Sequence, residues 1–285
     1  MTPTVTIIAP GNMGAAIGAR LVQNGLDVRT ALVGRSGTSA ARAEAAGMRA
    51  AEGDALVDVD LFLSVLPPGD AVALASATAE LMQTRARKPL YIDCNAVSPD
   101  TVGEIARIIE GAGAPFADGG IIGFPPREDY AGPKLYVSGP EAHQVAVLNA
   151  YGLDVRVLDG PVGAASALKM CYAGITKGIN AIGTAMVLAA ERAGAAEALR
   201  EEMADSIPNV LEGLSRSIPN SFDKAYRWVA EMNEIAQFAG DDEAGGDMFR
   251  AIANLYREIA GDRAGPEVKT GALMAFLRKP LPPKG

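Results

Sequence analysis

The segment Val5-Thr6-Ile7-Ile8-Ala9-Pro10-Gly11-Asn12-Met13-Gly14 decides the fold of this chain. It places a short β-branched run directly before a glycine turn, and the alanine-rich stretch 15–24 that follows has the composition of a helix. A strand, a glycine turn and a helix in this order form the first unit of a dinucleotide-binding domain. In such a unit Gly11 lets the backbone approach a pyrophosphate, Gly14 lets the helix pack on the strand, and the helix N-terminus donates N–H groups to the phosphates.

The loop departs from the usual fingerprint at one position, because Ala9 stands where the first glycine is common. A glycine turn can also open an ordinary αβ unit that binds no ligand. Strand, turn and helix all fall in place here, which favours the dinucleotide site. We therefore predict that Gly11, Asn12, Met13 and Gly14 contact the cofactor.

The end of the second predicted strand indicates which dinucleotide is bound. A free ribose 2′-hydroxyl normally calls for Asp or Glu at this position, but the chain has Val33-Gly34-Arg35-Ser36. The Arg35 guanidinium can pair with a 2′-phosphate, and the Ser36 hydroxyl can donate a hydrogen bond to it. The sequence therefore predicts NADP(H) over NAD(H); the alternative is that Arg35 is an ordinary solvated loop cation.

The first half of the chain repeats the pattern of its opening segment. Up to about residue 158, short apolar runs alternate with longer amphipathic stretches, which indicates βαβ units. We predict an α/β Rossmann domain, a doubly wound parallel sheet, over residues 1–160. The predicted strands are Val5–Ala9, Val28–Val33, Leu61–Val65, Leu90–Cys94, Leu135–Ser138 and Val155–Leu158.

The second half, residues 161–285, has helical spacing and almost no β-branched clusters, so it predicts an all-α C-terminal domain. A long helix is expected between Gly163 and Gly194. Proline and glycine breaks at 206–208, 217–219 and 261–266 divide the domain into four or five helices. Arg227 is spaced four residues from both Asp223 and Glu231, which predicts ion pairs within one helix.

Composition argues against several classes of partner. A net charge of −8 and a pI near 4.9 leave no broad positive field for nucleic acid phosphates or anionic lipid head groups. No stretch approaches the ~20 uninterrupted apolar residues of a membrane span. The N-terminus also lacks the basic segment and long apolar run of an export signal. We expect a cytoplasmic protein with neither nucleic acid nor membrane partners.

The few cysteine and histidine residues restrict the chemistry further. Cys94 and Cys171 cannot form a disulfide framework, and their scarcity suits a reducing compartment. His143 is the only histidine, so neither a histidine-rich metal site nor a Ser-His-Asp triad has support. We expect no bound metal.

Several motifs together resemble the β-hydroxyacid dehydrogenase family, which includes 3-hydroxyisobutyrate dehydrogenase and is related to 6-phosphogluconate dehydrogenase. The resemblance covers most of the chain and implies that Leu66 and Pro67 lie beside the cofactor. It also implies that Asn95 orients the substrate or the nicotinamide amide, although an asparagine after a strand is often only a turn former. The motifs are Gly11-Asn12-Met13-Gly14, Leu66-Pro67-Pro68 and Asp93-Cys94-Asn95-Ala96-Val97-Ser98-Pro99.

The most informative part of the resemblance is Gly163-Ala164-Ala165-Ser166-Ala167-Leu168-Lys169, which is similar to the family's Gly-x-x-x-x-x-Lys segment. In that family the lysine gives and takes the proton. The resemblance implies that Lys169 is the general acid or base, a role typically worth about 10²- to 10⁴-fold in rate. The alternative is a surface lysine whose stem lies along the helix.

Two positions depart from the family pattern. The substrate loop 118–124 ends in Ile122-Gly123-Phe124, where the family has Ser-Gly-Gly, and this makes the pocket more apolar. The family's asparagine one turn after the lysine is Ala173 here, so its contact with the alcohol or carboxylate is absent. The resemblance still implies that Ile122 and Gly123 bind substrate, and helical spacing lets Thr176 replace the asparagine in part.

The sequence therefore predicts an NADP-dependent oxidoreductase acting on the CH–OH group of a small hydroxy acid, or on the matching oxo acid. The resemblance implies a homodimer and a substrate role for the helical domain, 161–285, whose segment Tyr226–Met232 resembles a divergent C-terminal variety of this superfamily. One alternative is an imine (C=N) reductase on the same scaffold, where the lysine is usually replaced. A second is a non-catalytic NADPH-binding sensor, motivated by Ile122, Phe124 and Ala173. Retention of Lys169 favours the dehydrogenase.

Overall fold

Eight strands form one sheet in the first half of the chain. The computed structural model describes residues 2–127, 130, 132–240 and 243–278. The spatial order is β3-β2-β1-β4-β5-β6-β7-β8, and neighbouring strands are parallel except for the antiparallel β6–β7 pair. The strands are β1 (Thr4–Ile8), β2 (Asp27–Thr30), β3 (Arg49–Ala50), β4 (Leu61–Ser64), β5 (Leu90–Asp93), β6 (Phe116–Ile122), β7 (Lys134–Ser138) and β8 (Asp154–Val157).

This arrangement confirms the doubly wound α/β fold. The chain leaves β1 toward β2 on one side and later places β4 on its other side, so the strand order reverses between β1 and β4. Ligands of such sheets bind outside the carboxyl ends of the strands at this switch point. The two loops that follow β1 and β4 are the ones that the sequence assigns to the cofactor.

Two strands lie outside the predicted set, β3 and β6. Strand β6 reads Phe-Ala-Asp-Gly-Gly-Ile-Ile, and its aspartate and glycines have low strand propensity. The glycines are there for close packing: a Cβ on Gly119 would lie 2.8 Å from the Asp93 carbonyl oxygen, and one on Gly120 would lie 2.7 Å from the Ala165 carbonyl oxygen. Tertiary contact therefore overrides local preference in this strand.

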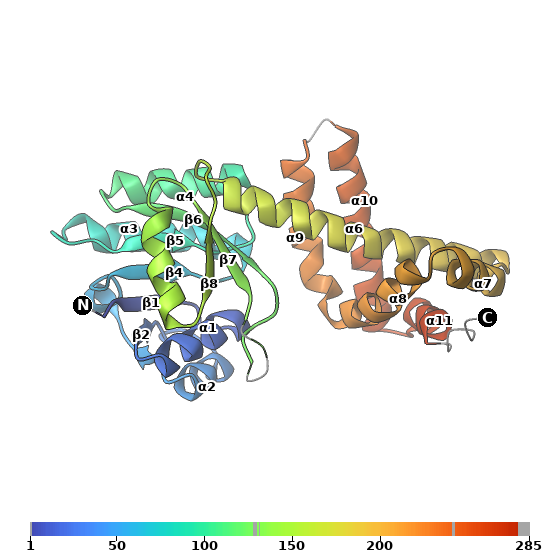
Figure 1. The fold of residues 1–285 in the computed structure, drawn as a ribbon, viewed down its shortest axis with the longest axis horizontal. Coiled ribbons are helices and arrows are strands. Elements are labelled where there is room, and N and C mark those ends of the chain that lie inside the picture. The colour runs from blue at the N-terminus through green and yellow to red at the C-terminus, as the bar shows by residue number, and fades with distance from the viewer. Residues whose placement is uncertain (1, 128–129, 131, 241–242, 279–285) are drawn as a thin grey trace. The chain divides into compact units, whose positions relative to one another are not determined.

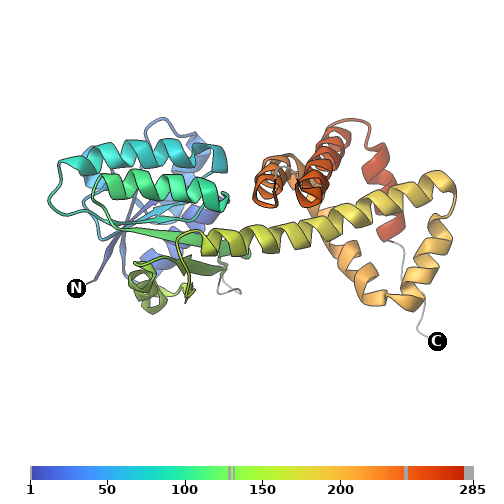
Figure 2. The same cartoon turned by 90° about the horizontal axis from the view of Figure 1, so that it is seen from above.

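Helices cover both faces of the sheet (Figures 1 and 2). One buried cluster joins the strands to α1 (Asn12–Gln23), α2 (Gly37–Ala45) and α5 (Ala142–Val145), and the other joins them to α3 (Ala71–Gln83) and α4 (Pro99–Gly111). Short 3₁₀ turns η1 (Gly53–Leu56), η2 (Pro68–Asp70) and η3 (Ala146–Tyr151) complete the connections.

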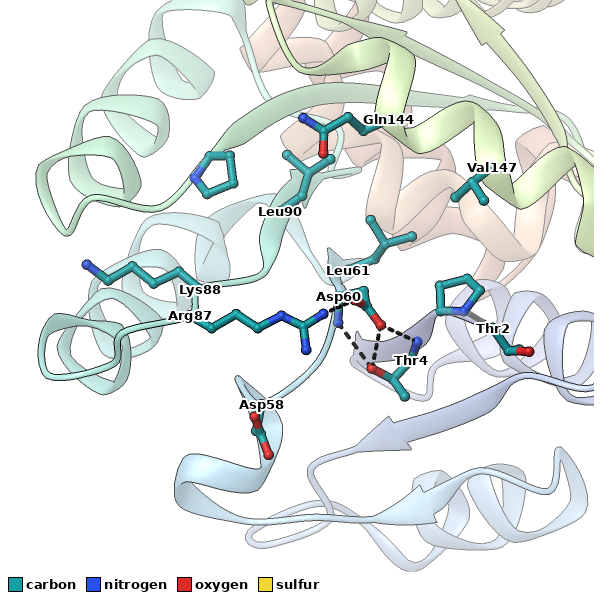
Figure 3. Close-up of a pocket in the computed structure, with 12 residues that line it drawn as sticks. Thr2, Thr4, Asp58, Asp60, Leu61, Arg87, Lys88, Leu90, Gln144 and Val147 are labelled. Atoms are coloured by element: carbon teal, nitrogen blue, oxygen red, sulfur yellow. Dashed lines mark hydrogen bonds and ion pairs between the residues drawn. The ribbon is translucent and has the colours of Figure 1, made fainter.

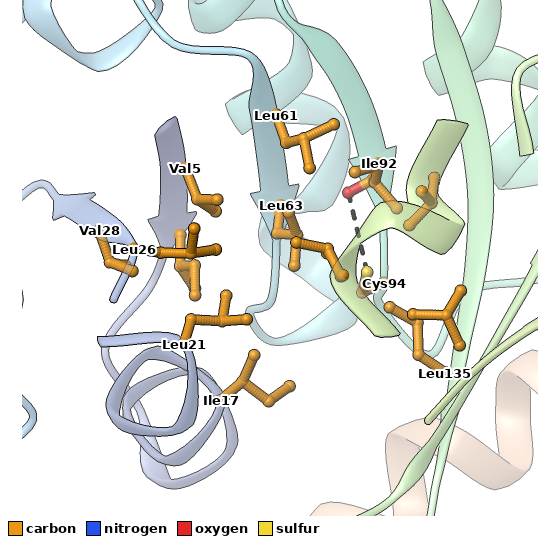
Figure 4. Packing of buried hydrophobic residues seen from close by; sticks show 14 of the residues in the cluster. Val5, Ile17, Leu21, Leu26, Val28, Leu61, Leu63, Ile92, Cys94 and Leu135 are labelled. Atoms are coloured by element: carbon orange, nitrogen blue, oxygen red, sulfur yellow. Dashed lines mark hydrogen bonds between the residues drawn. The ribbon is translucent and has the colours of Figure 1, made fainter. Parts of the chain in front are cut away.

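The core under α1 consists of aliphatic side chains from neighbouring strands (Figure 4). Leu21 of α1 and Leu63 of β4 are fully buried, and burial of a side chain of this size stabilises the fold by ~1.5–3 kcal/mol. On the opposite face three aromatic rings stack across adjacent strands, with centroids 5.1 Å apart for Phe62–Tyr91 and 6.0 Å apart for Tyr91–Phe116. These contacts hold β4, β5 and β6 in register.

The chain divides into two compact units, Met1–Met170 and Cys171–Gly285. The division lies inside the long helix α6 (Ala164–Ala193) and not ahead of it, because the first turns of α6 pack on β6. The second unit contains only helices among its described residues, and they break at Pro208, Pro219 and after Arg263 as predicted. They are α7 (Ala196–Ser206), α8 (Pro208–Ser217), η4 (Pro219–Lys224), α9 (Ala225–Phe238), α10 (Ala244–Arg263) and α11 (Val268–Leu277). A further break between α9 and α10 was not predicted, so the described residues from α6 onward form six α-helices and not the expected four or five.

Helices α9 and α10 pack on α6 in the second unit through Trp228, whose ring meets Tyr256 edge-on at 5.1 Å. The Lys177 ammonium lies 5.0 Å from the Trp228 ring centroid and forms an ion pair with Glu231. Asp223 pairs with Arg263 instead of Arg227. The predicted pairing of Arg227 with these two acids is therefore wrong, because tertiary partners take both carboxylates.

Among the described residues, α6 is the one helix whose length and composition would allow it to cross a membrane. Its most apolar window has a mean hydropathy of 1.2, and 44% of that window is buried within the protein. A core helix of a globular protein meets the same criteria, so this feature alone does not indicate a membrane span.

Candidate functional site

The loop after β1 has the geometry of a phosphate cradle. The Gly11 N–H donates to the Ala9 carbonyl oxygen at 2.8 Å, and α1 begins at Asn12 without a side-chain cap. A helix start that lacks a side-chain cap leaves its first N–H groups for a ligand or water. A Cβ at Gly14 would lie 2.1 Å from the Ala9 oxygen, whereas one at Gly11 would meet nothing within 4 Å. Gly14 is thus required for packing, and Gly11 borders open space.

These features fit a dinucleotide. Gly11, Asn12, Met13 and Gly14 would hold its pyrophosphate with backbone N–H groups at the positive end of α1. When bound, the nicotinamide would supply or accept a hydride. The chemistry of the donors suits an anion, since no acidic residue occurs in the first turn of α1.

Arg35 and Ser36 lie at the start of α2, beyond the end of β2. Ser36 is the N-cap of α2, and its Oγ accepts from the Ser39 N–H at 3.3 Å. Arg35 is exposed next to it. A second helix N-terminus beside a guanidinium is a suitable place for a 2′-phosphate.

The loop after β4 is tied to the end of β5 by Asn95. The Leu66 N–H donates to Asn95 Oδ1 at 2.7 Å, and Asn95 Nδ2 donates to Ser64 Oγ and to Asp93 Oδ2, both at 2.7 Å. Asn95 is only 2% exposed, and these contacts use both of its amide protons. The structure therefore gives Asn95 a role different from the predicted direct contact: it holds the Leu66–Pro67 loop in place.

Two fully buried carboxylates lie beneath this edge of the sheet, Asp93 at the end of β5 and Asp118 in β6. The pKa of Asp93 is raised to about 7, chiefly by burial and also by the Asp118 charge, while hydrogen bonds from Asn95 and the Lys169 cation oppose this rise. Burial likewise raises the pKa of the Cys94 thiol, and Lys169 again opposes the shift. The Lys169 ammonium therefore lies within electrostatic reach of this cluster.

Lys169 is on the second turn of α6 and is partly exposed. A Cβ on Gly120 would lie 3.4 Å from the Lys169 Cβ, so the glycine in β6 allows this part of the helix to approach the sheet. The stem of Lys169 thus starts directly over β6, one strand away from Asp93.

The predicted substrate residues fall in two places. Ile122 is the last residue of β6, and Gly123 follows it with a φ of +131°, a conformation that L side chains rarely adopt. Phe124 is 61% exposed. Thr176 lies in the second unit, where its Oγ1 donates to the Tyr172 carbonyl oxygen at 2.9 Å. In the first unit, the cofactor loops, Lys169 and the end of β6 lie along the carboxyl edge of the sheet.

The sequence did not reveal the supporting role of five polar residues at this edge, all of which are fully buried: Ser64, Asp93, Asp118, Ser138 and Ser166. One signal was present in β6, where an aspartate interrupts an apolar run. A charged residue inside a buried strand requires partners, and these lie far away in the chain.

A cavity of about 610 Å³ lies at the opposite edge of the sheet (Figure 3). Asp60 in its lining is bound within the fold: it accepts from the Thr4 N–H at 2.8 Å and from Thr4 Oγ1 at 2.9 Å, and it pairs with Arg87. The cavity lies at the amino ends of β1, β4 and β5, whereas the cofactor loops follow the carboxyl ends of β1 and β4. No cluster of potential metal ligands occurs in the part of the chain that the structure describes.

Two curated relatives match part of this chain. A 28.5 kDa protein in the 7S RNA 5′ region of Methanothermus fervidus is 30% identical over 159 residues, which are 55% of this chain and 59% of that protein. The mitochondrial 3-hydroxyisobutyrate dehydrogenase of Drosophila melanogaster is 26% identical over 170 residues, 59% of this chain and 52% of that enzyme. The match thus spans little more than half the length of either relative.

Solved structures match nearly the whole chain. A conserved protein of unknown function, reported to resemble 3-hydroxyacid dehydrogenases, is 27% identical with a TM-score of 0.73 and covers 92% of this chain and 98% of its own. The 3-hydroxyisobutyrate dehydrogenase of Mycobacterium tuberculosis has a TM-score of 0.73 at 20% identity, over 98% and 100% of the two chains. An imine reductase of Streptomyces aurantiacus has a TM-score of 0.57 at 19% identity, over 97% and 100%. The last two share the fold.

Family matches agree with the two units. Residues 190–259 match a domain of unknown function, DUF1932. Residues 4–152 match the NAD binding domain of 6-phosphogluconate dehydrogenase, which confirms the resemblance read from the sequence. Because that match includes more than half of the chain, this protein belongs to the family that carries the NAD binding domain of 6-phosphogluconate dehydrogenase.

Proposed function

We propose that this protein is an NADP-dependent oxidoreductase that transfers a hydride between the nicotinamide and a small hydroxy acid or the matching oxo acid. The observation that carries the proposal is the position of Lys169. The Lys169 Cβ lies next to Gly120, on the same edge of the sheet as the phosphate-binding loop Gly11–Gly14, and the Lys169 cation lowers the pKa of the buried Asp93. The dehydrogenases among the similar proteins support the same reaction class.

The protein's part in this reaction is to orient the reactants and to move one proton. Gly11–Gly14 and the Leu66–Pro67 loop, which Asn95 braces, hold the cofactor. In the direction of reduction, Lys169 Nζ donates a proton to the carbonyl oxygen as it becomes the hydroxyl. In the direction of oxidation, Nζ takes that proton back. Ile122 and Gly123 form the substrate wall.

The reaction is tested by following NADPH oxidation with a panel of small oxo acids, semialdehydes and cyclic imines. Turnover of an oxo compound supports the hydroxy acid reaction. Turnover of imines without dependence on Lys169 would instead favour a C=N reductase, which the shared fold of an imine reductase makes the main alternative. Tight NADPH binding with no turnover on any compound would favour a sensor.

The preference for NADP is expected to depend on Arg35. Arg35→Ala removes a charge-assisted contact worth ~1.5–3 kcal/mol, so kcat/KM with NADPH should fall about 10- to 100-fold while kcat/KM with NADH stays constant. Arg49→Ala is the matched control, because Arg49 is exposed on β3 and pairs with Asp27. Equal efficiency of the wild type with both cofactors would contradict the preference.

We also propose that the protein is a homodimer formed through one face of α6. Five large apolar side chains on this helix are 52–64% exposed, and they are spaced alternately by three and four residues. They are Tyr172, Ile175, Ile179, Ile182 and Met186. This is the spacing of a helix that packs against another helix. Lys177 is the charged residue between Tyr172 and Met186, and its ammonium forms an ion pair with Glu231 of α9.

A second copy fits this face better than another partner. The five positions are nearly symmetric about Ile179, so two antiparallel copies would place equivalent side chains in contact around a twofold axis. Full burial of such a side chain removes roughly 60–120 Å² of apolar area from water, so ten side chains that are a little over half exposed would bury roughly 350–700 Å². A polar rim of similar area would bring the whole interface to the ~1,000 Å² that a specific contact needs.

Light scattering after size exclusion is expected to give twice the chain mass of 29.4 kDa. Replacing both Ile179 and Ile182 by Asp should yield the monomer, because it buries four like charges in the interface. Val268→Asp is the matched control: Val268 is 68% exposed in the same unit but lies on α11. A monomeric wild type would contradict the dimer, and a dimeric double variant would exclude this face.

We further propose that the protein acts in the cytoplasm on a small-molecule carboxylate, without nucleic acid or membrane partners. The net charge of −8 supports this, because it opposes binding to phosphate-rich surfaces.

A further inference from the structure

The start of α6 is capped in an unusual way. The residue before the helix is Gly163, which has no side chain to accept from the first-turn N–H groups and has a φ of +99°. The Ala164 N–H bonds to the Pro161 carbonyl oxygen at 3.1 Å. The remaining N–H groups of the first turn need acceptors from elsewhere, since buried unpaired donors are costly.

The sheet supplies those acceptors. Asp118 Oδ2 accepts from the Gly163 and Ser166 N–H groups, both at 3.0 Å. Ser138 Oγ accepts from the Ala165 N–H at 3.0 Å. Asp118 and Ser138 face one another in the antiparallel β6–β7 register, so one pair of opposed strand residues accepts from the N–H groups of Gly163, Ala165 and Ser166.

Additional bonds lock the arrangement. Ser138 Oγ donates to Asp118 Oδ2 at 3.0 Å, and Ser166 Oγ donates to Asp118 Oδ1 at 2.6 Å. All three side chains are fully buried. A carboxylate with four donors, placed at the positive end of a 30-residue helix, is a strong anchor. We call Asp118, Ser138 and Ser166 the α6 anchor.

The α6 anchor is adjacent to Lys169. Lys169 follows Ser166 by three residues and therefore lies on the same side of α6. On β6, Gly120 follows Asp118 by two residues and faces the same side of the sheet, where it contacts the helix next to the Lys169 Cβ. The anchor and this contact together determine how far the first two turns of α6 lie from the sheet and how they are rotated about the helix axis.

We propose that Asp118 is a positioning residue for Lys169, acting with Ser138 and Ser166 through the N-terminus of α6. This inference rests on the proposed role of Lys169. A misplacement of a reacting group by about 1 Å can cost about 100-fold in rate. The anchor restricts Lys169 Nζ to the place where the proton is transferred, whereas an ordinary helix cap would contribute stability alone.

Three variants separate the effect of the position of Lys169 from the effect of the charge of Asp118. Asp118→Ala removes the acceptor and should lower kcat about 100-fold with the KM for NADPH unchanged. Asp118→Asn is expected to keep kcat close to the wild type, because its oxygen can accept from the two N–H groups and its amide can donate to Ser166 Oγ. Ser138→Ala keeps every charge and should have an intermediate effect. Thr6→Val is the matched control, since it removes another buried strand hydroxyl, which donates to the Leu56 carbonyl oxygen at 2.7 Å.

A second measurement needs no substrate. After reductive methylation with ¹³C-formaldehyde, the Lys169 resonance is identified by its absence in Lys169→Ala, and its titration is followed by NMR. The midpoint should move in Ser138→Ala, because the ammonium shifts relative to Asp93 and Asp118, and it should not move in Thr6→Val. If Asp118→Ala does not fold, kcat and the Lys169 titration midpoint of Ser138→Ala, compared with those of Thr6→Val, test the proposal.

The outcomes separate this inference from the proposed function. Wild-type turnover in Lys169→Ala would refute the catalytic role of Lys169, while the NMR titration would still test the anchor. Loss of turnover in Lys169→Ala, together with wild-type kcat and titration in folded Ser138→Ala and Asp118→Ala, would reduce the anchor to a structural cap and overturn the inference.

Discussion

Turnover of the best oxo substrate should fall at least about 100-fold when Lys169 is replaced by alanine, with NADPH affinity unchanged. The loss follows from removal of the group that exchanges a proton with the substrate oxygen. Folding should not suffer, because Lys169 is partly exposed on a helix and alanine is the strongest helix former. The measurement compares kcat and kcat/KM for NADPH oxidation, together with NADPH binding by fluorescence.

Lys169→Arg makes this test sharper. Arginine keeps the positive charge but does not release its proton at accessible pH, so a proton-transfer role predicts a loss similar to that in alanine. A purely electrostatic role predicts that arginine restores most of the rate. Lys269→Ala on α11 is the control, because its ammonium pairs with the exposed Glu258. Wild-type turnover in Lys169→Ala would exclude Lys169 as the acid or base.

Replacement of the two glycines of the first loop by alanine should lower different quantities: the stability of the fold for Gly14 and the affinity for NADPH for Gly11. Gly14→Ala places a Cβ 2.1 Å from the Ala9 carbonyl oxygen, so β1 and α1 must separate and the melting temperature should fall by several degrees. Gly11→Ala meets nothing within 4 Å and its φ of −72° suits any residue, so stability should not change. Its methyl group enters the space assigned to the pyrophosphate, and NADPH affinity should fall at least about 10-fold.

Thermal melts without cofactor and NADPH titrations on the same samples separate these effects. Gly37→Ala, at the start of α2, also meets open space and shows what an ordinary glycine replacement does there. If Gly11→Ala binds NADPH like the wild type, the phosphate cradle lies elsewhere. If Gly14→Ala melts like the wild type, the close packing between α1 and Ala9 is not essential.

The dinucleotide loop could be predicted because its meaning is local. Strand, turn and helix occupy contiguous residues from Val5 to Asn24, and each depends on short-range backbone preferences. The helix boundaries of the second unit were equally accessible, since Pro208 and Pro219 act at the positions where they occur. Lys169 was found through a contiguous motif as well.

Supporting residues of the site could not be found in this way. Strand β6 has the propensities of a turn, and it becomes a strand only because Gly119 and Gly120 allow neighbouring backbone to approach. The family resemblance implied a ligand contact for Asn95, yet its amide bonds to Leu66, Ser64 and Asp93. The same holds for Arg227, whose expected partners pair with Lys177 and Arg263.

The sequence by itself thus determined the fold class through its alternating strand and helix patterns, and its contiguous motifs led to the proposed cofactor loop and, through the family resemblance, to Lys169. Only the tertiary structure decided how Asp118 meets Ser166, which is 48 residues away, and that Asp93 lies within reach of Lys169. Burial, pKa and hydrogen-bond partners depend on which distant segments come together, and no local pattern records that choice.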